Sequence, residues 1–330
     1  MSESESEAFY LAEGCLIHRD NRKTLMGVLG SFEFTETLLG LSNVLHSSAI
    51  WIPLNPYKLR EQYKISKYQN TNQGINGMNK TTSKKLNKAD QYNDPEHNYL
   101  RYWDGRDYEQ AAEEIAIRRL LKNMKFKSAV DVGGGYGRLS VVLRDYADKV
   151  TLAEPSQQQL DIAKNFLKGK PKVDAKLAQA EKLPFDDGTV DLCMVIRVIH
   201  HLPNPVPAFE EIYRVLEKDG YFLIEFANYS NFKNRIKHAV KFQKMPIDPV
   251  DIKTHESDIP FVNHNPKTVK KQLAQTGFKL EQVLSVSNFR SPTLKKILPK
   301  SVLVKLEKSL QKPLAKTYFG PSTVYLLRKV

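Results

Sequence analysis

A cluster of glycines directly follows an apolar run in the stretch SAVDVGGGYGRLS, Ser128–Ser140. A turn without side chains lets a ligand approach the backbone, and such turns follow the first strand of α/β sheets at the ligand-binding edge. The dinucleotide pattern G-x-G-x-x-G does not fit, because its third glycine, counted from Gly133, would fall on Arg138. The phosphate-loop pattern G-x-x-x-x-G-K does not fit either. The stretch therefore predicts another kind of ligand site, built on Gly133, Gly135 and Gly137.

Two carboxylates accompany this turn. Asp131 lies at the end of the apolar run, where it could cap the turn or hold a ligand amino group, and the glycine spacing favours the ligand role. Glu154 ends the next predicted strand in VTLAEPS, nineteen residues after Gly135. A carboxylate there can accept hydrogen bonds from both ribose hydroxyls of a nucleoside, although dinucleotide enzymes share this acid. Glu154 therefore does not by itself discriminate between these ligand classes.

The pattern D-x-G-x-G-x-G resembles motif I of the class I S-adenosylmethionine-dependent methyltransferases. The stretch AQAEKLPFDDGTVDLCMVIRVIHHLPNPVPAFEEIYRVLEKDGYFLIEF resembles the methyltransferase-11 type, which includes ubiquinone and menaquinone biosynthesis methylases. The resemblance implies S-adenosylmethionine as cofactor, held by Asp131, the glycines and Glu154. It also implies that Gln179 and Ala180 contact adenine. The family usually has Asp at the position of Gln179, so a neutral amide would accept that hydrogen bond here.

Three further side chains are candidates for the site. Arg197 could meet an acidic acceptor or pair with a neighbouring acid, and Tyr102 could form a lid over the cofactor with Trp103 or pack against the core. His200 follows the fourth predicted strand and could act as a general base. A structural imidazole is the more frequent role of a histidine at such a position. Methyl transfer requires no nucleophile, since the sulfonium is an activated donor and positioning supplies the rate.

The elements that would position these residues alternate along the chain. Helical spacing at DYEQAAEEIAIRRLLKNM predicts a helix before the glycine turn, and strands are expected around residues 129–132, 149–153, 190–196 and 220–226. This alternation favours a doubly wound, Rossmann-like α/β sheet with helices on both faces. The resemblance implies seven strands with a reversed last strand, TVYLLRKV. We expect an N-terminal accessory region at 1–63, a polar linker at 64–95 and the methyltransferase domain at 96–330, with an acceptor-shaping insertion at 228–265.

Composition limits the partners. The formal charge is +13, and residues 266–330 hold 14 Lys and Arg against Glu281 and Glu307. This basic C-terminal segment could contact RNA or an anionic membrane surface, or be solvated only. Within it, LPKSVLVKLEKSLQK predicts an amphipathic basic helix with Val302, Leu303, Leu306 and Leu310 on its apolar face.

Two cysteines argue against a disulfide framework and indicate no metal site. The N-terminus lacks the zones of a secretory signal, and no apolar run is long enough to span a membrane, so we expect a cytoplasmic protein. The leading functional prediction is methyl transfer from S-adenosylmethionine to a small organic acceptor, amphiphilic molecules included. RNA methylation is the alternative within enzymes. A non-catalytic S-adenosylmethionine-binding or scaffold protein is the alternative of another class.

Overall fold

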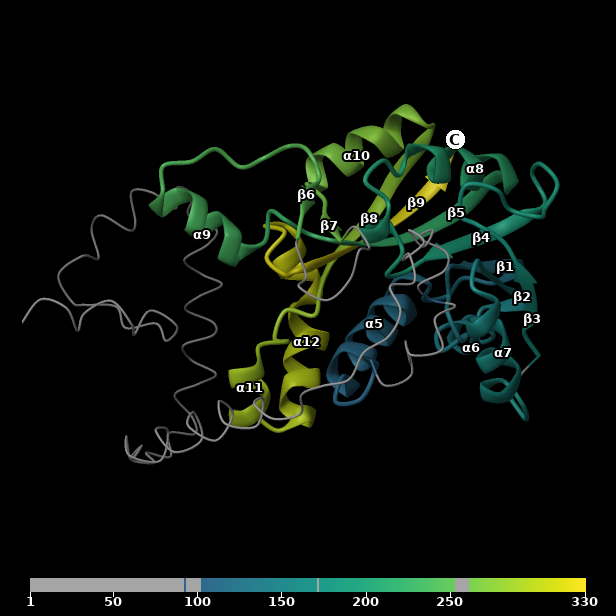
Figure 1. Cartoon of the computed structure of the whole chain (residues 1–330), viewed down its shortest axis with the longest axis horizontal. Helices are drawn as coiled ribbons and strands as arrows, with labels where there is room; N and C mark the ends of the chain where they lie inside the picture. Colours follow the sequence, from purple (N-terminus) through teal and green to yellow (C-terminus); the bar gives the residue numbers. More distant parts are fainter. Residues whose placement is uncertain (1–91, 93–101, 171, 253–260) are drawn as a thin grey trace, which may run out of the picture. The chain divides into compact units, whose positions relative to one another are not determined.

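A seven-stranded sheet forms the centre of the computed structural model, which describes residues 92, 102–170, 172–252 and 261–330. The strand order is β3-β2-β1-β4-β5-β9-β8 (Figure 1). All neighbouring strands pair in parallel except β9, which runs antiparallel to both β5 and β8. The bounds are β1 Phe126–Val132, β2 Ala147–Glu154, β3 Asp174–Leu177, β4 Val190–Val195, β5 Leu216–Ala227, β8 Phe278–Val286 and β9 Ser322–Lys329. The predicted doubly wound sheet and its reversed last strand are confirmed.

Helices cover both faces of this sheet because its central strands are apolar on both sides. In β4, Cys193 and Val195 face one hydrophobic cluster, and Leu192 and Met194 face the other. The first cluster includes residues of α8 and α10, and the second includes residues of α5 and α6. Besides α9, which lies in the insertion described below, the α-helices of the described residues are α5 Asp107–Leu120, α6 Ser140–Leu143, α7 Gln157–Phe166, α8 Val206–Val215, α10 Pro266–Gln275, α11 Pro292–Ile297 and α12 Lys300–Ala315.

The strand order changes direction between β1 and β4. From β1 the chain builds outward through β2 and β3, then returns to place β4 on the other side of β1. A ligand crevice forms outside the carboxyl ends of the strands at such a switch point. The glycine turn after β1 and the residues that follow β4 both lie at this edge.

The basic C-terminal helix α12 packs against the domain. Leu303 is 1% exposed, and the helix contacts β8 and α5. Its buried positions are Leu303, Glu307, Gln311, Leu314 and Ala315. Of the predicted apolar face of Val302, Leu303, Leu306 and Leu310, only Leu303 is buried. The inward face is rotated from the prediction, because the buried Glu307 and Gln311 have hydrogen-bond partners there.

The expected insertion at 228–265 contains α9, Phe232–Val240, and a two-stranded ribbon of β6, Val250–Asp251, and β7, Val262–Asn263. The predicted accessory region at 1–63 lies outside the described residues, as does the predicted linker at 64–95 apart from Tyr92. Among the helices that the structure describes, none combines the length and the apolar character needed to cross a membrane.

Candidate functional site

The glycine turn adopts a backbone conformation that side chains disfavour. Gly133, Gly135 and Gly137 have φ angles of 68°, 59° and 83°. At Gly133 an added Cβ would lie 2.4 Å from Cγ2 of Val198, so the approach of the segment after β4 also requires glycine. The turn therefore exposes backbone groups at the carboxyl edge of the sheet.

Asp131 is buried at the end of β1, directly before this turn. Its Oδ2 accepts a hydrogen bond from Ser140 Oγ at 2.7 Å. Burial raises the pKa of the Asp131 carboxyl to about 6, although the Ser140 hydroxyl and the Arg138 charge act in the opposite direction. The hydroxyl occupies one oxygen, which leaves acceptor capacity for a further donor.

Glu154 ends β2 and is bound to the glycine turn. The backbone N–H of Gly135 donates to Glu154 Oε2 at 2.8 Å, and the N–H of Ser156 donates to Oε1 at 3.0 Å. Burial raises the pKa of Glu154 to about 7, which these two N–H groups oppose and the nearby Asp131 charge reinforces. The parallel pairing of β1 and β2 thus brings both carboxylates to one edge, as the sequence predicts.

The two positions expected at adenine follow β3. Gln179 is exposed and forms an isolated antiparallel bridge with Lys182, whereas Ala180 is 8% exposed and belongs to the core cluster beside α8. Their backbone is thus fixed at the same carboxyl edge, with one side chain in solvent and one in the core.

Arg197 pairs with an acid of α5, one of the two roles considered for it. Its Nε donates to Glu113 Oε1 at 2.6 Å, and its backbone N–H donates to Glu225 Oε2 at 2.9 Å. Its φ of 61° is unusual for a residue with a side chain, and such strain concentrates at functional sites. The two bonds hold this segment after β4 in place.

Glu113 connects the glycine turn to the end of β4. It is 3% exposed, and its second oxygen accepts from Arg138 Nη2 at 2.6 Å. Burial alone would raise the pKa of Glu113, but the charges of Arg138 and Arg197 outweigh it and lower that pKa. We call this set of Arg138, Glu113 and Arg197 the buried ion network.

Aromatic residues before α5 lie against this network. The Trp103 ring is 3.6 Å from the Arg138 guanidinium carbon and 5.0 Å from that of Arg197, measured to the ring centroid. Tyr102 is 36% exposed and carries the Arg106 guanidinium over its ring at 3.8 Å. Of the two predicted lid residues, Trp103 is thus held by cation–π contacts and Tyr102 faces solvent.

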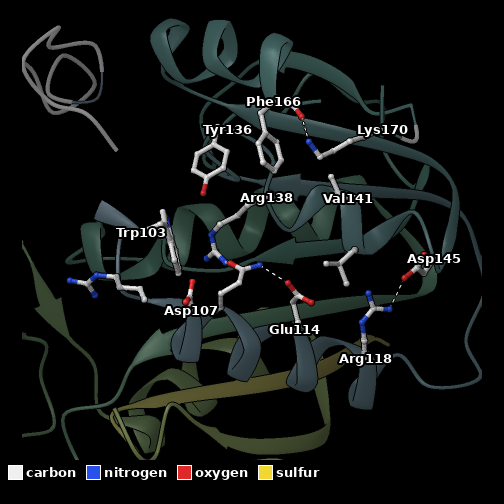
Figure 2. A pocket seen from close by; sticks show the side chains of 13 residues that line it. Trp103, Asp107, Glu114, Arg118, Tyr136, Arg138, Val141, Asp145, Phe166 and Lys170 are labelled. Carbon is white, nitrogen blue, oxygen red and sulfur yellow. Dashed lines mark hydrogen bonds and ion pairs between the residues drawn. The ribbon is translucent and has the colours of Figure 1, made fainter. Parts of the chain in front are cut away.

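A cavity of about 510 Å³ opens beside the network (Figure 2). Aromatic rings of Tyr136 and Phe166 line one part, and the ion pair between Arg118 and Asp145 lies at another. Asp131 and Glu154 are not among its lining residues. The cavity adjoins the glycine turn, because Tyr136 and Arg138 line it.

His200 lies in a short 3₁₀ turn, Ile199–His201, and is 7% exposed. Its ring stacks on Phe261 with centroids 4.2 Å apart. Burial, together with His201, Arg197 and His264, lowers the pKa of His200 well below its usual value. The neutral imidazole is consequently a weak base, and its catalytic role stays a prediction.

Sequence reasoning missed Tyr92, which falls in the range assigned to the polar linker. Its hydroxyl and Nε2 of His201 are 2.7 Å apart, and its carbonyl accepts from Ser156 Oγ at 2.8 Å. Tyr92 therefore spans the ends of β2 and β4. The only available signal was an aromatic residue at the end of a polar run.

Residues 130–224 match the family model described as a methyltransferase domain. This segment is a methyltransferase domain. It contains the glycine turn and extends through β4 into β5, so the methyltransferase-11 resemblance is confirmed, and with it the S-adenosylmethionine cofactor of that type.

Curated relatives carry related descriptions. An uncharacterized methyltransferase of Bacillus subtilis, YcgJ, is 27% identical over 124 residues, covering 36% of this chain and 49% of the relative. An uncharacterized methyltransferase of Schizosaccharomyces pombe is 35% identical over 119 residues, covering 33% of this chain and 43% of the relative. The chain thus spans less than half the length of either relative. An uncharacterized protein of Methanocaldococcus jannaschii is 29% identical over 227 residues, covering 66% of this chain and 85% of the relative.

Solved structures with a similar arrangement include an S-adenosylmethionine-dependent methyltransferase from Mesorhizobium loti, with 16% identity and a TM-score of 0.46 over 66% of this chain and 98% of that one. A methyltransferase from Thermotoga maritima, described as a possible histamine N-methyltransferase, has 20% identity and a TM-score of 0.47, covering 73% of this chain and 99% of that one.

Proposed function

We propose that this chain transfers a methyl group from S-adenosylmethionine to a small organic acceptor, amphiphilic molecules included. The observation that carries the proposal is the hydrogen bond from the Gly135 N–H to Glu154, which fixes a buried carboxylate beside a side-chain-free turn. Asp131 stands at the same edge. This donor and acceptor set suits a nucleoside joined to an amino acid.

The chemistry of the two carboxylates fits the cofactor. An ionised carboxylate offers about four acceptor positions, and Glu154 uses two of them for backbone N–H groups. The remaining positions would accept the ribose hydroxyls. Asp131 would bind the methionyl ammonium, while Gln179 and Ala180 would contact adenine and Tyr102 and Arg197 would border the site.

The cofactor, when bound, would supply an activated methyl group. The chain's own residues then have to position the two reactants and exclude water, and have to remove a proton only from an acceptor that is not already ionised. The buried ion network holds the glycine turn and the end of β4 at fixed separation, which supports positioning. A neutral His200 can accept a proton only weakly. We therefore favour an acceptor that is already ionised or intrinsically nucleophilic.

The small-molecule acceptor rests on the resemblance to small-molecule methylases. The insertion at 228–265, which follows β5 at the carboxyl edge and includes α9, would shape the acceptor pocket. RNA methylation is the second candidate, because the basic C-terminal segment could contact RNA as well as an anionic membrane. A scaffold protein that binds the cofactor without catalysis is the third.

Calorimetry with S-adenosylmethionine and its demethylated product tests the cofactor site. The change Glu154→Ala should weaken binding by about 1.5–3 kcal/mol, because hydrogen bonds to a charged group are lost. Asp148→Ala is the matched control, since Asp148 is an exposed acid of the same strand. Equal affinity of the native protein and the Glu154 variant would contradict the assignment.

Incubation with labelled S-adenosylmethionine and a cell extract tests the acceptor. Label in metabolites or lipids supports the proposal, and label in RNA supports the second candidate. Tight donor binding without label in any fraction supports the scaffold.

A further inference from the structure

Helix α9 presents apolar side chains to solvent. None of its nine described residues is buried, and Ile236 and Val240 are 42% and 73% exposed. Phe242, in the turn that follows, is 98% exposed. Single exposed apolar residues are ordinary, but a contiguous group marks an interaction site.

Basic side chains run along the same helix beside these apolar ones. Residues four apart lie on one face, so Ile236 and Val240 form one stripe and Lys233, Lys237 and Lys241 form the next. All three lysines are exposed. We call these two stripes together with Phe242 the α9 surface.

The segment around α9 is strongly basic. Residues 228–247 contain no Asp or Glu and carry five cationic side chains, Lys233, Arg235, Lys237, Lys241 and Lys244. None of the ion pairs found within the described residues involves any of the five. The lysines of the α9 surface are exposed and positively charged, so this surface can attract a polyanion.

The helix is attached to the domain at its first turn. The N–H of Phe232 donates to the carbonyl of Phe319 at 3.0 Å, and the two rings stack with centroids 4.9 Å apart. Asn231 caps the helix by accepting from the N–H of Asn234. From this attachment α9 extends away from the central sheet (Figure 1), so its far end is presented without support from the core.

We propose that the α9 surface docks on an anionic lipid bilayer, with Ile236, Val240 and Phe242 entering the interface and the lysines contacting lipid phosphates. Interfacial helices combine such an apolar stripe with Lys on the neighbouring face. An RNA backbone would engage the lysines but would leave the apolar stripe in water, which favours lipid. Helix α12 also carries lysines, but its Leu303 is buried against the domain.

Docking through α9 would bring the insertion at 228–265 to the membrane surface, where amphiphilic molecules concentrate. Access to amphiphilic acceptors at the membrane matters only if the proposed function is correct, so this part of the inference rests on that function. Membrane binding itself depends only on the α9 surface and is tested independently.

Sedimentation of the full chain with phosphatidylglycerol vesicles and with phosphatidylcholine vesicles tests the proposal. We expect binding to the anionic vesicles at low salt, loss of binding as ionic strength rises, and poor binding to the neutral ones. The double change Lys233→Gln, Lys237→Gln should weaken binding roughly 25-fold, at about fivefold for each lysine. The double change Val240→Ser, Phe242→Ser should weaken it at least about tenfold, because apolar burial is lost while charge is kept.

The matched control is Lys305→Gln, Lys308→Gln, which removes the same charge from the exposed face of α12 and should leave binding close to native. Thermal unfolding of each variant verifies that it is folded. The proposal is overturned if native protein ignores anionic vesicles at low salt, or if the α12 variant loses as much binding as the α9 variants. A structured RNA that displaces the protein from vesicles, with the Val240 and Phe242 changes having no effect, would assign the surface to RNA instead.

Discussion

Three of the buried carboxylates near the carboxyl edge differ in ionisation because their partners differ. Asp131 and Glu154 accept hydrogen bonds from a hydroxyl and from backbone N–H groups, and burial raises the pKa of both. Glu113 accepts from two guanidinium groups, and their charges overcome burial and lower its pKa. At the scale of residues, Asp131 and Glu154 thus titrate closer to neutral pH than ordinary carboxyls, while Glu113 stays ionised.

Donor binding should therefore weaken on acidification. Ionised carboxylates accept hydrogen bonds from hydroxyl and ammonium groups best, and the pKa values are about 7 for Glu154 and about 6 for Asp131. Affinity for the demethylated product should fall about tenfold between about pH 8 and about pH 6, measured by calorimetry. In Glu154→Gln this dependence should be shallower, and an unchanged pH profile in that variant would contradict the role of Glu154.

The raised pKa values of Asp131 and Glu154 affect folding stability in the opposite direction from donor binding. A carboxyl whose pKa is raised by folding binds more protons in the native state, so these groups reduce stability as pH rises through the range from the unfolded pKa to the folded one. Glu113, with its lowered pKa, contributes stability that is lost on acidification.

Removal of Glu113 should destabilise the domain strongly. Glu113→Ala leaves Arg138 and Arg197, whose side chains are 8% and 15% exposed, without their shared counter-ion. We expect a loss of about 3–5 kcal/mol in the free energy of unfolding, measured with urea. Glu114→Ala removes the half-buried neighbour, which among the described residues accepts a side-chain hydrogen bond from Gln110 alone, and should cost about 1 kcal/mol or less. Similar losses in the two variants would show that the network contributes little.

At the scale of elements, the C-terminal helix α12 supports the loop after β8. Glu307 accepts from Tyr108 Oη of α5 at 2.6 Å and from the N–H groups of Ser287 and Asn288. Burial raises the pKa of Glu307, while its hydrogen bonds act in the opposite direction. The helix therefore ties two segments of the domain together as well as presenting lysines.

Two leucines of α12 should consequently differ in their contributions to stability. Leu303→Ala should lower the free energy of unfolding by about 2–5 kcal/mol, because the fully buried side chain leaves a cavity. Leu306→Ala should cost clearly less, since Leu306 is only half-buried. Urea unfolding compares the two, and an equal or larger loss at Leu306 would contradict the observed helix face.

At the scale of the whole molecule, the described core is complete within one unit. Residues Lys84–Val330 form one compact unit, and all three hydrophobic clusters lie within residues 103–327 of it. This unit retains Tyr92 and its contacts with Ser156 and His201.

A fragment of Lys84–Val330 should therefore fold and unfold cooperatively. Its thermal midpoint should lie close to the corresponding transition of the full chain, monitored by circular dichroism. A fragment that starts at Lys122 is the control and should not fold cooperatively. It lacks α5, and with that helix it loses Glu113 of the buried ion network and Ile117 of the second hydrophobic cluster. Failure of the longer fragment to unfold cooperatively would show that the core depends on residues before Lys84.

The sequence by itself determined the features that depend on local pattern. The glycine turn, Asp131 and Glu154 were identified because a turn between strand and helix needs specific residues at fixed spacing. The sheet was predictable for the same reason, since buried parallel strands appear as apolar runs between helical repeats.

Only the tertiary structure decided which distant residues meet. The pairing of Glu113 with Arg138 and Arg197, the contact of Tyr92 with His201 and the inward face of α12 each join residues whose separation along the chain carries no periodic signal. Such contacts depend on how whole elements pack, and packing is fixed by the shape of the complete core.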